Sequence, residues 1–130
     1  MVIDTSALIA ILSAEPEAET FATAIAAATS RLLSAASFLE TAVVVESRHG
    51  SAGGEKLDEL IQVAHIQIEP VTAEQAAAAR LAYRSFGKGR HPAALNFGDC
   101  FAYALAKVTD KPLLFKANDF NRTDIATALD

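Results

Sequence analysis

Short apolar runs alternate with longer amphipathic segments along this chain, and that alternation limits the folds it can adopt. The short runs have the length and apolar content of buried strands and lie at residues 2–3, 31–34, 66–69, 113–115 and 125–129. The longer segments carry apolar side chains at helical spacing and lie at residues 4–12, 17–28, 37–48, 55–65, 72–86 and 98–108. Strands that alternate with helices predict an α/β domain with a short, mainly parallel central sheet.

Two segments interrupt this pattern, Gly50 to Gly54 and Gly87 to Pro92. Neither is long enough to separate two domains, and a chain of 130 residues has the usual length of one domain. We therefore expect a single domain over residues 1–130.

A carboxylate stands at four of the expected element ends. Asp4 directly follows the first strand, and Asp119 follows the strand at 113–115 after a short turn. Glu40 and Asp99 fall in the first turns of two helices. In a parallel sheet these ends share one edge, where ligands bind. Clustered carboxylates repel each other unless a cation joins them, so the pattern predicts Mg²⁺ or Mn²⁺ and phosphodiester hydrolysis.

Each of these acids also fits a purely structural role in a helix cap or a turn. The relevant patterns are the spacing Ser37-x-x-Glu40, the spacing Asn96-x-x-Asp99, an N-cap at Asp4 and the turn dipeptide Asn118-Asp119. Position alone leaves the structural and the catalytic interpretations open.

The strings around the acids resemble, in order, four motifs of the PIN-domain ribonucleases, in particular the VapC toxins of bacterial toxin–antitoxin pairs. The strings are VIDTSAL at 2–8, SAASFLE at 34–40, NFGDCFAYA at 96–104 and LLFKANDF at 113–120, with Thr123-Asp124-Ile125 fitting the usual ending. The resemblance covers the whole chain. One departure is Ala117, which stands where a glycine often precedes Asn118.

The resemblance implies a PIN-like three-layer α/β/α domain and a Mg²⁺-dependent endoribonuclease. Asp4, Glu40 and Asp99 match the three core acids and Asp119 the more variable fourth, so all four are expected to be catalytic and to bind the metal. Mn²⁺ is an expected substitute for Mg²⁺. The resemblance also implies an RNA substrate, an inhibitory VapB-type antitoxin and a homodimer, with part of the apolar stretches 21–28 and 38–45 at these interfaces.

Five further residues are candidates for substrate binding. Thr5 or Ser6 would match a hydroxyl near the metal. Arg84 and Arg90, in one series with Arg80 and Lys88, form either a solvated charged face or a basic track for the RNA backbone that leads to the acids. Lys116 either contacts substrate or pairs with an acid. The aromatic residues, Phe97 among them, are expected in the core rather than in base stacking.

The composition of the chain restricts the class of protein and the location that we expect. A net charge of −5 argues against a protein that coats DNA non-specifically. The single cysteine, Cys100, excludes an internal disulfide, and no signal peptide or long apolar run appears, so we expect a cytoplasmic protein without a membrane span. Two rivals to the nuclease stay open at this point, a phosphotransfer domain and a non-catalytic PIN-like interaction module.

Overall fold

Four short strands pair in parallel in the order β3-β2-β1-β4 within the part of the chain that the structure describes. This computed structural model describes residues 1–116 and 120–129. The strands are β1 Val2–Ile3, β2 Leu32–Ser34, β3 Gln67–Glu69 and β4 Leu113–Leu114. The sheet is therefore short and parallel, as the alternating pattern predicts.

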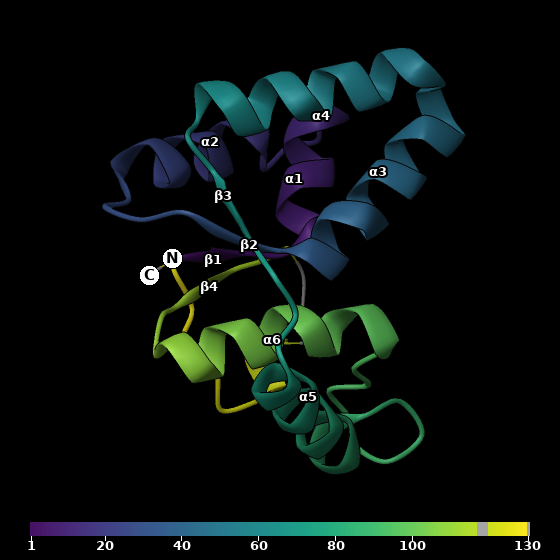
Figure 1. Ribbon diagram of the computed structural model, residues 1–130, viewed down its shortest axis with the longest axis vertical. Helices are drawn as coiled ribbons and strands as arrows, with labels where there is room; N and C mark the ends of the chain where they lie inside the picture. The colour runs from purple at the N-terminus through teal and green to yellow at the C-terminus, as the bar shows by residue number, and fades with distance from the viewer. Residues whose placement is uncertain (117–119, 130) are drawn as a thin grey trace.

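Helices cover both faces of this sheet (Figure 1). Their bounds are α1 Thr5–Leu12, α2 Ala18–Ala27, α3 Ala35–His49, α4 Ser51–Val63, α5 Ala73–Phe86 and α6 Phe97–Thr109. Helices α1 to α4 lie on one side, and α5 and α6 lie together on the other. The α/β class and the three-layer α/β/α arrangement are thus confirmed.

Neighbouring residues of β1, β2 and β4 point into opposite cores, because side chains alternate along a strand. Val2, Leu32 and Leu113 are in register with each other and pack against α5 and α6. Their successors Ile3, Leu33 and Leu114 pack against α1 to α4. Residues of β1, β2 and β4 are buried on both faces of the sheet, which explains their mainly apolar sequences, whereas β3 is largely exposed.

Helix α4 begins earlier than its sequence predicts. The glycine-rich segment was expected to interrupt the chain as far as Gly54, but only Gly50 separates α3 from α4, at a φ of 68°. A Cβ on Gly53 would lie 2.5 Å from the carbonyl oxygen of Val45. Gly53 therefore permits close packing of α4 on α3, and this packing outweighs the weak helix propensity of glycine.

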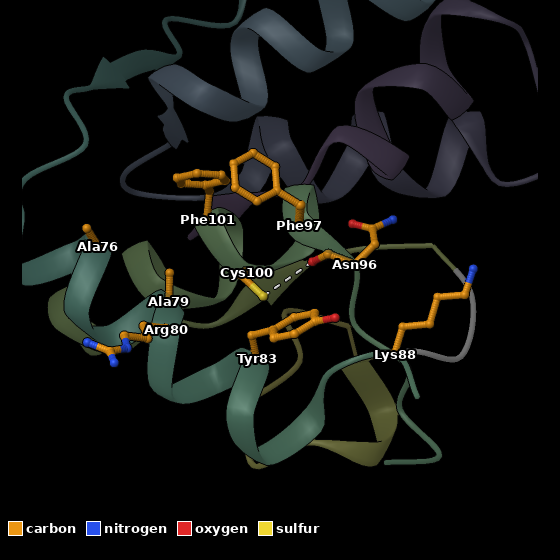
Figure 2. Close-up of a pocket in the computed structure, with 9 residues that line it drawn as sticks. All are labelled: Ala76, Ala79, Arg80, Tyr83, Lys88, Asn96, Phe97, Cys100 and Phe101. Atoms are coloured by element: carbon orange, nitrogen blue, oxygen red, sulfur yellow. Dashed lines mark hydrogen bonds between the residues drawn. The ribbon is translucent and has the colours of Figure 1, made fainter. Parts of the chain in front are cut away.

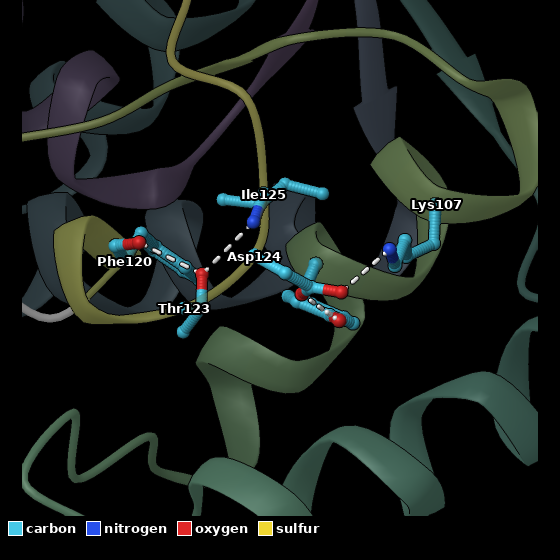
Figure 3. Close-up of polar contacts among 6 residues, drawn as sticks. Lys107, Phe120, Thr123, Asp124 and Ile125 are labelled. Atoms are coloured by element: carbon cyan, nitrogen blue, oxygen red, sulfur yellow. Dashed lines mark hydrogen bonds and ion pairs between the residues drawn. The ribbon is translucent and has the colours of Figure 1, made fainter.

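The strand expected at residues 125–129 is wrong. Only Thr127 forms an isolated parallel bridge, to Leu113, and a short 3₁₀ helix at Phe120–Arg122 precedes it. Two backbone hydrogen bonds of 2.9 Å join Leu113 to this segment, one to the Ala126 carbonyl and one from the Ala128 N–H. Side chains also hold it (Figure 3): Asp124 accepts hydrogen bonds from the Tyr103 hydroxyl and from Lys107, the latter at 2.7 Å. These bonds fasten the C-terminal segment to α6.

None of the helices in the described ranges is long and apolar enough to cross a membrane.

Candidate active site

Asp4 is the N-cap of α1 and is almost completely buried. Its Oδ2 accepts hydrogen bonds from the Ser6 backbone N–H at 3.0 Å and from the Ser6 hydroxyl at 2.6 Å. Burial raises the pKa of this carboxyl to about 6, against hydrogen bonds from Ser6 that lower it, and the charge of Glu40 raises it further. The structural role in a cap is confirmed, but a cap needs neither a buried carboxylate nor a second acid beside it.

Glu40 does not belong to a capping box. Helix α3 begins at Ala35, two residues before Ser37. Its N-cap is Ser34, whose hydroxyl oxygen accepts a hydrogen bond from the Ala36 N–H at 3.2 Å. The Glu40 carboxylate turns to α1 instead, where Oε1 accepts a hydrogen bond of 2.8 Å from the Thr5 hydroxyl. The structural explanation suggested by the sequence is therefore wrong for Glu40, which is tied to the residue next to Asp4.

Asp99 forms a true capping box at the start of α6. Its Oδ2 accepts from the Asn96 N–H at 2.9 Å, and its own N–H donates to Asn96 Oδ1 at 2.8 Å. The capping interpretation is thus confirmed for Asp99, and it fixes the carboxylate at the first turn of the helix. The capping role of Asp99 does not exclude a metal-binding role, because a carboxylate has acceptor positions beyond the one that the cap uses.

Gly98 brings this first turn of α6 against Glu40. A Cβ on Gly98 would lie 2.7 Å from Glu40 Cδ, well inside van der Waals contact. Glu40 is therefore in contact with α6 beside Asp99 and with α1 beside Asp4. The structure brings the three acid-bearing turns together at the carboxyl edge of the sheet, whereas Asp119 lies outside the described residues.

The chemistry of these donors fits a hard divalent cation. Carboxylate and hydroxyl oxygens are the ligands that such cations take, and a positive charge would relieve the burial of Asp4 beside Glu40. Within residues 1–116 and 120–129, no three acidic, histidine or cysteine side chains stand close enough to form a ready-made metal cluster. Mg²⁺ does not need one, because it retains several waters and uses one or two carboxylates.

Sequence reasoning missed two residues at this place, Gly98 and Ser37. Ser37 is buried, its carbonyl oxygen accepts hydrogen bonds from Thr5 and Thr41, and its hydroxyl has no partner in the described part of the chain. One signal in the sequence could have identified Gly98. Glycine has a weak helix propensity, so a glycine in the first turn of a predicted helix indicates a special requirement at that position. The sequence marks Ser37 only by its spacing from Glu40 and its place in the second motif.

Gly98→Ala should reduce catalysis without unfolding the protein. Alanine is the better helix former, but its Cβ would displace the Glu40 carboxylate. We expect activity to fall about tenfold or more, since small displacements of catalytic groups cost up to about a hundredfold. Gly54→Ala in α4 is the matched control, because its Cβ would meet only the flexible, exposed Glu46 side chain. Equal activity of the two variants in an RNA cleavage assay would contradict the close approach.

Ser6 links the end of β4 to Asp4. Its hydroxyl donates to Asp4 Oδ2 and accepts a hydrogen bond of 2.9 Å from the Lys116 N–H. The Lys116 amino group pairs with Glu15 and Glu17, and hydrogen bonds to these two acids raise its pKa. The structure therefore favours the acid-pairing alternative for Lys116, and substrate contact by this residue stays a prediction.

The predicted basic track lies on the exposed side of α5 and the loop after it. Arg84 and Arg90 are both exposed, and the Arg90 guanidinium lies 5.9 Å from the centre of the Tyr83 ring. Cys100 is buried and donates to the Asn96 carbonyl at 3.3 Å. Burial, together with the charge of Asp99, raises the pKa of its thiol to about 11, so Cys100 is a packed side chain and not a nucleophile.

The family model described as PIN domain matches residues 1–126. This chain belongs to the PIN-domain family. The resemblance to this family is thereby confirmed, and the match extends over the sheet and both helical layers. In this PIN domain Asp4 follows β1, Glu40 lies in α3 and Asp99 lies in α6.

Relatives of this PIN domain carry VapC names. It is 58% identical to the VapC ribonuclease Mb0640 of Mycobacterium bovis over 127 residues, which cover 98% of this chain and 97% of that protein. It is also 58% identical to a ribonuclease VapC of Mycolicibacterium smegmatis, over 97% of this chain and 98% of that protein. The PIN domain is thus a VapC family member.

A solved structure shares the PIN fold. The crystal structure of VapC20 of Mycobacterium tuberculosis matches with a TM-score of 0.76 over 96% of this chain and 95% of that chain. The two sequences are 17% identical, so this match supports the fold alone.

Proposed function

We propose that this chain is a metal-dependent endoribonuclease that acts as the toxin of a VapBC pair and is inhibited by its cognate antitoxin. One observation carries the proposal. Glu40 contacts both acid-bearing helix starts, through the Thr5 hydrogen bond on one side and through Gly98 on the other. Relatives with 58% identity over nearly the whole chain are named ribonucleases, which supports RNA as the substrate.

Mg²⁺ is the proposed cofactor, with Mn²⁺ as a substitute. Asp4, Glu40 and Asp99 are the proposed ligands, directly or through water, and Asp119 is proposed to complete the set. When bound, the cation would polarise the scissile phosphate, lower the pKa of water and stabilise the leaving oxygen. Supporting this choice, all the donors are oxygen atoms and Asp4 is a buried acid beside a second one.

Glu40 is the proposed general base. The Thr5 hydroxyl holds Oε1, which leaves Oε2 directed at the first turn of α6 beside Gly98. A water oxygen would attack phosphorus as the bond to O3′ breaks, while Oε2 takes the proton of the water and O3′ takes one from solvent. The products would carry a 5′-phosphate and a 3′-hydroxyl.

Incubation of the purified chain with total RNA tests the proposal. We expect fragments with a 5′-phosphate and a 3′-hydroxyl in Mg²⁺ and no fragments in EDTA. Fragments that end in a 2′,3′-cyclic phosphate would contradict attack by water. A chain that neither cuts RNA nor binds Mn²⁺ in a calorimetric titration would instead be a non-catalytic interaction module.

The proposed partners are a VapB-type antitoxin and a second copy of the chain. Phe21 and Ile25 of α2 are buried in the core and offer little surface. Leu39 and Val43 of α3 are 62% and 57% exposed, and their spacing of four residues places them on one face of the helix. This face of α3 is our candidate for an interface. We also propose a cytoplasmic location, where RNA is present and a lone thiol such as Cys100 stays reduced.

Neutralising the proposed RNA track should weaken binding through electrostatics alone. For Arg84→Gln with Arg90→Gln, each lost phosphate contact should reduce the slope of log K against log salt by about 0.7. Titrations of a labelled single-stranded RNA at several salt concentrations measure this slope. Arg48→Gln with Lys56→Gln, exposed on α3 and α4, is the matched control. An unchanged slope in the Arg84 and Arg90 variant would refute the track.

A further inference from the structure

A groove of about 600 Å³ is lined by residues of α5, of the start of α6 and of the segment that joins them (Figure 2). Its aromatic walls are Phe97 and Phe101 from α6 and Tyr83 from α5. Figure 2 shows the two phenylalanine rings on one side of the groove and the tyrosine on the other. The size is that of a small-ligand site.

Phe97 is the unusual residue in this groove. Its side chain is 78% exposed, although we expected it in the core, so that expectation is wrong. The Phe97 and Phe101 rings lie edge to face with ring centres 4.9 Å apart, which supports the orientation of the exposed Phe97 ring. An exposed ring held in place by a second ring is suited to stacking with a flat ligand.

The charges around the groove indicate an anionic ligand. Of the described residues that line it, the charged ones are Arg80 and Lys88, and both are exposed cations. The whole chain has a net charge of −5, so this pair departs from the overall balance. An apolar peptide would need the rings but not the cations. Aromatic rings flanked by cations are typical of sites for single-stranded nucleic acid.

The groove is continuous with the proposed active site. Asn96 and Phe97 line it, and Asn96 is the N-cap that holds Asp99 in the capping box. Gly98, the next residue, contacts Glu40. The groove therefore borders the first turn of α6, which carries Asp99 and contacts Glu40.

We propose that this groove binds an unpaired nucleobase of the RNA substrate by stacking on Phe97, with the adjoining phosphates at Arg80 and Lys88. This inference rests on the proposed ribonuclease function and adds to it the recognition of a base next to the cleaved bond. It makes unpaired RNA the substrate, because a base within a helix cannot enter the groove.

RNA binding by three Phe97 variants tests the stacking. A labelled, unstructured RNA of about ten nucleotides, within the usual site size, is titrated by fluorescence anisotropy in Mg²⁺, with Asp4→Asn added to every protein to prevent cleavage. Phe97→Leu keeps an apolar side chain but loses the ring, so affinity should fall about tenfold, as should that of Phe97→Ala. Phe97→Tyr should bind almost as the parent does. Val63→Ala, which alters an exposed apolar residue of α4, is the control.

Removal of single bases from the RNA gives the second readout. With Phe97 present, an abasic site at one position should weaken binding by a similar factor, and in Phe97→Leu that position should lose its effect. One result would overturn the proposed base-binding role of the groove without contradicting the proposed ribonuclease function. In that result Phe97→Leu and its parent bind RNA equally well, while the wild type still cleaves RNA in Mg²⁺. Unchanged affinity together with dissociation of a dimer would assign the groove to a second copy and also overturn the proposal. A wild type that neither cuts nor binds RNA would overturn the proposed function itself.

Discussion

Replacing Asp4 with Asn should abolish metal-dependent RNA cleavage and, without metal, should stabilise the fold. A metal ligand contributes several kcal/mol to transition-state stabilisation, so we expect a rate at least about a thousandfold lower. The Asn side-chain oxygen can still accept the hydrogen bonds of Ser6 that cap α1. The fold should therefore survive while the charge that holds the cation is lost.

The stability gain should depend on pH in a defined direction. Burial raises the pKa of Asp4 from 3.8 to about 6, so its contribution to stability is complete below pH 3.8 and is lost as the pH rises through about 6. Above that pH the ionised side chain costs about 3 kcal/mol, from a shift of about two pKa units. Asp4→Asn removes this cost, so in EDTA the variant should be more stable than the wild type at pH 8 and equal to it near pH 3.

Urea unfolding in EDTA at the two pH values measures the difference. Asp58→Asn, which neutralises an exposed aspartate of α4, is the control and should change neither activity nor the pH dependence. Full cleavage by Asp4→Asn would remove Asp4 from the site. Equal stability of variant and wild type at pH 8 would show that burial does not penalise its charge.

Replacing Glu40 with Gln should lower the cleavage rate by about a hundredfold or more, since general-base catalysis contributes about 10² to 10⁴. The amide oxygen can still accept the hydrogen bond of Thr5, but the side chain can neither take a proton nor carry a charge. The same change should lower the pKa of Asp4, because the Glu40 charge raises it in addition to burial.

Two measurements on Glu40→Gln separate catalysis from structure. Single-turnover cleavage gives the rate, and a carboxyl-resolved NMR titration in EDTA gives the pKa of Asp4. Glu59→Gln, at an exposed position of α4, should change neither quantity. A slow variant whose Asp4 pKa equals that of the wild type would place Glu40 away from Asp4 and contradict the site.

Strands and helices whose apolar residues follow a regular spacing could be predicted from the sequence. Strands β1, β2 and β4 are apolar because each side chain enters one of the two cores, and this double burial leaves a clear sequence signal. The beginning of α4 could not be predicted, since Gly53 depends on contact with α3. The strand predicted at the C-terminus is wrong for a similar reason. Backbone pairing of that segment with β4 is limited to Leu113, and contacts of Asp124 with side chains of α6 hold the rest.

The positions of Asp4, Glu40 and Asp99 at the ends of elements could be predicted from the sequence, but the contacts of Glu40 could not. From the sequence alone, Ser34 and Ser37 are equally suitable N-caps. Because α3 begins after Ser34 in the structure, Glu40 lies beyond the capping-box position. The link from Thr5 to Glu40 spans 35 residues and leaves no local signal. We expected Phe97 in the core because aromatic residues are usually buried. Phe97 is exposed because it is the first residue of α6, where the helix begins at the surface.

Cleavage of total RNA by the wild type and by Asp99→Asn tests the central claim most directly. The variant should fold normally, because an Asn oxygen can accept the same hydrogen bond from the Asn96 N–H. We predict cutting by the wild type in Mg²⁺, none in EDTA and none by Asp99→Asn in Mg²⁺. Equal cutting by Asp99→Asn, or by the wild type in EDTA, would contradict a metal-dependent site built from these acids.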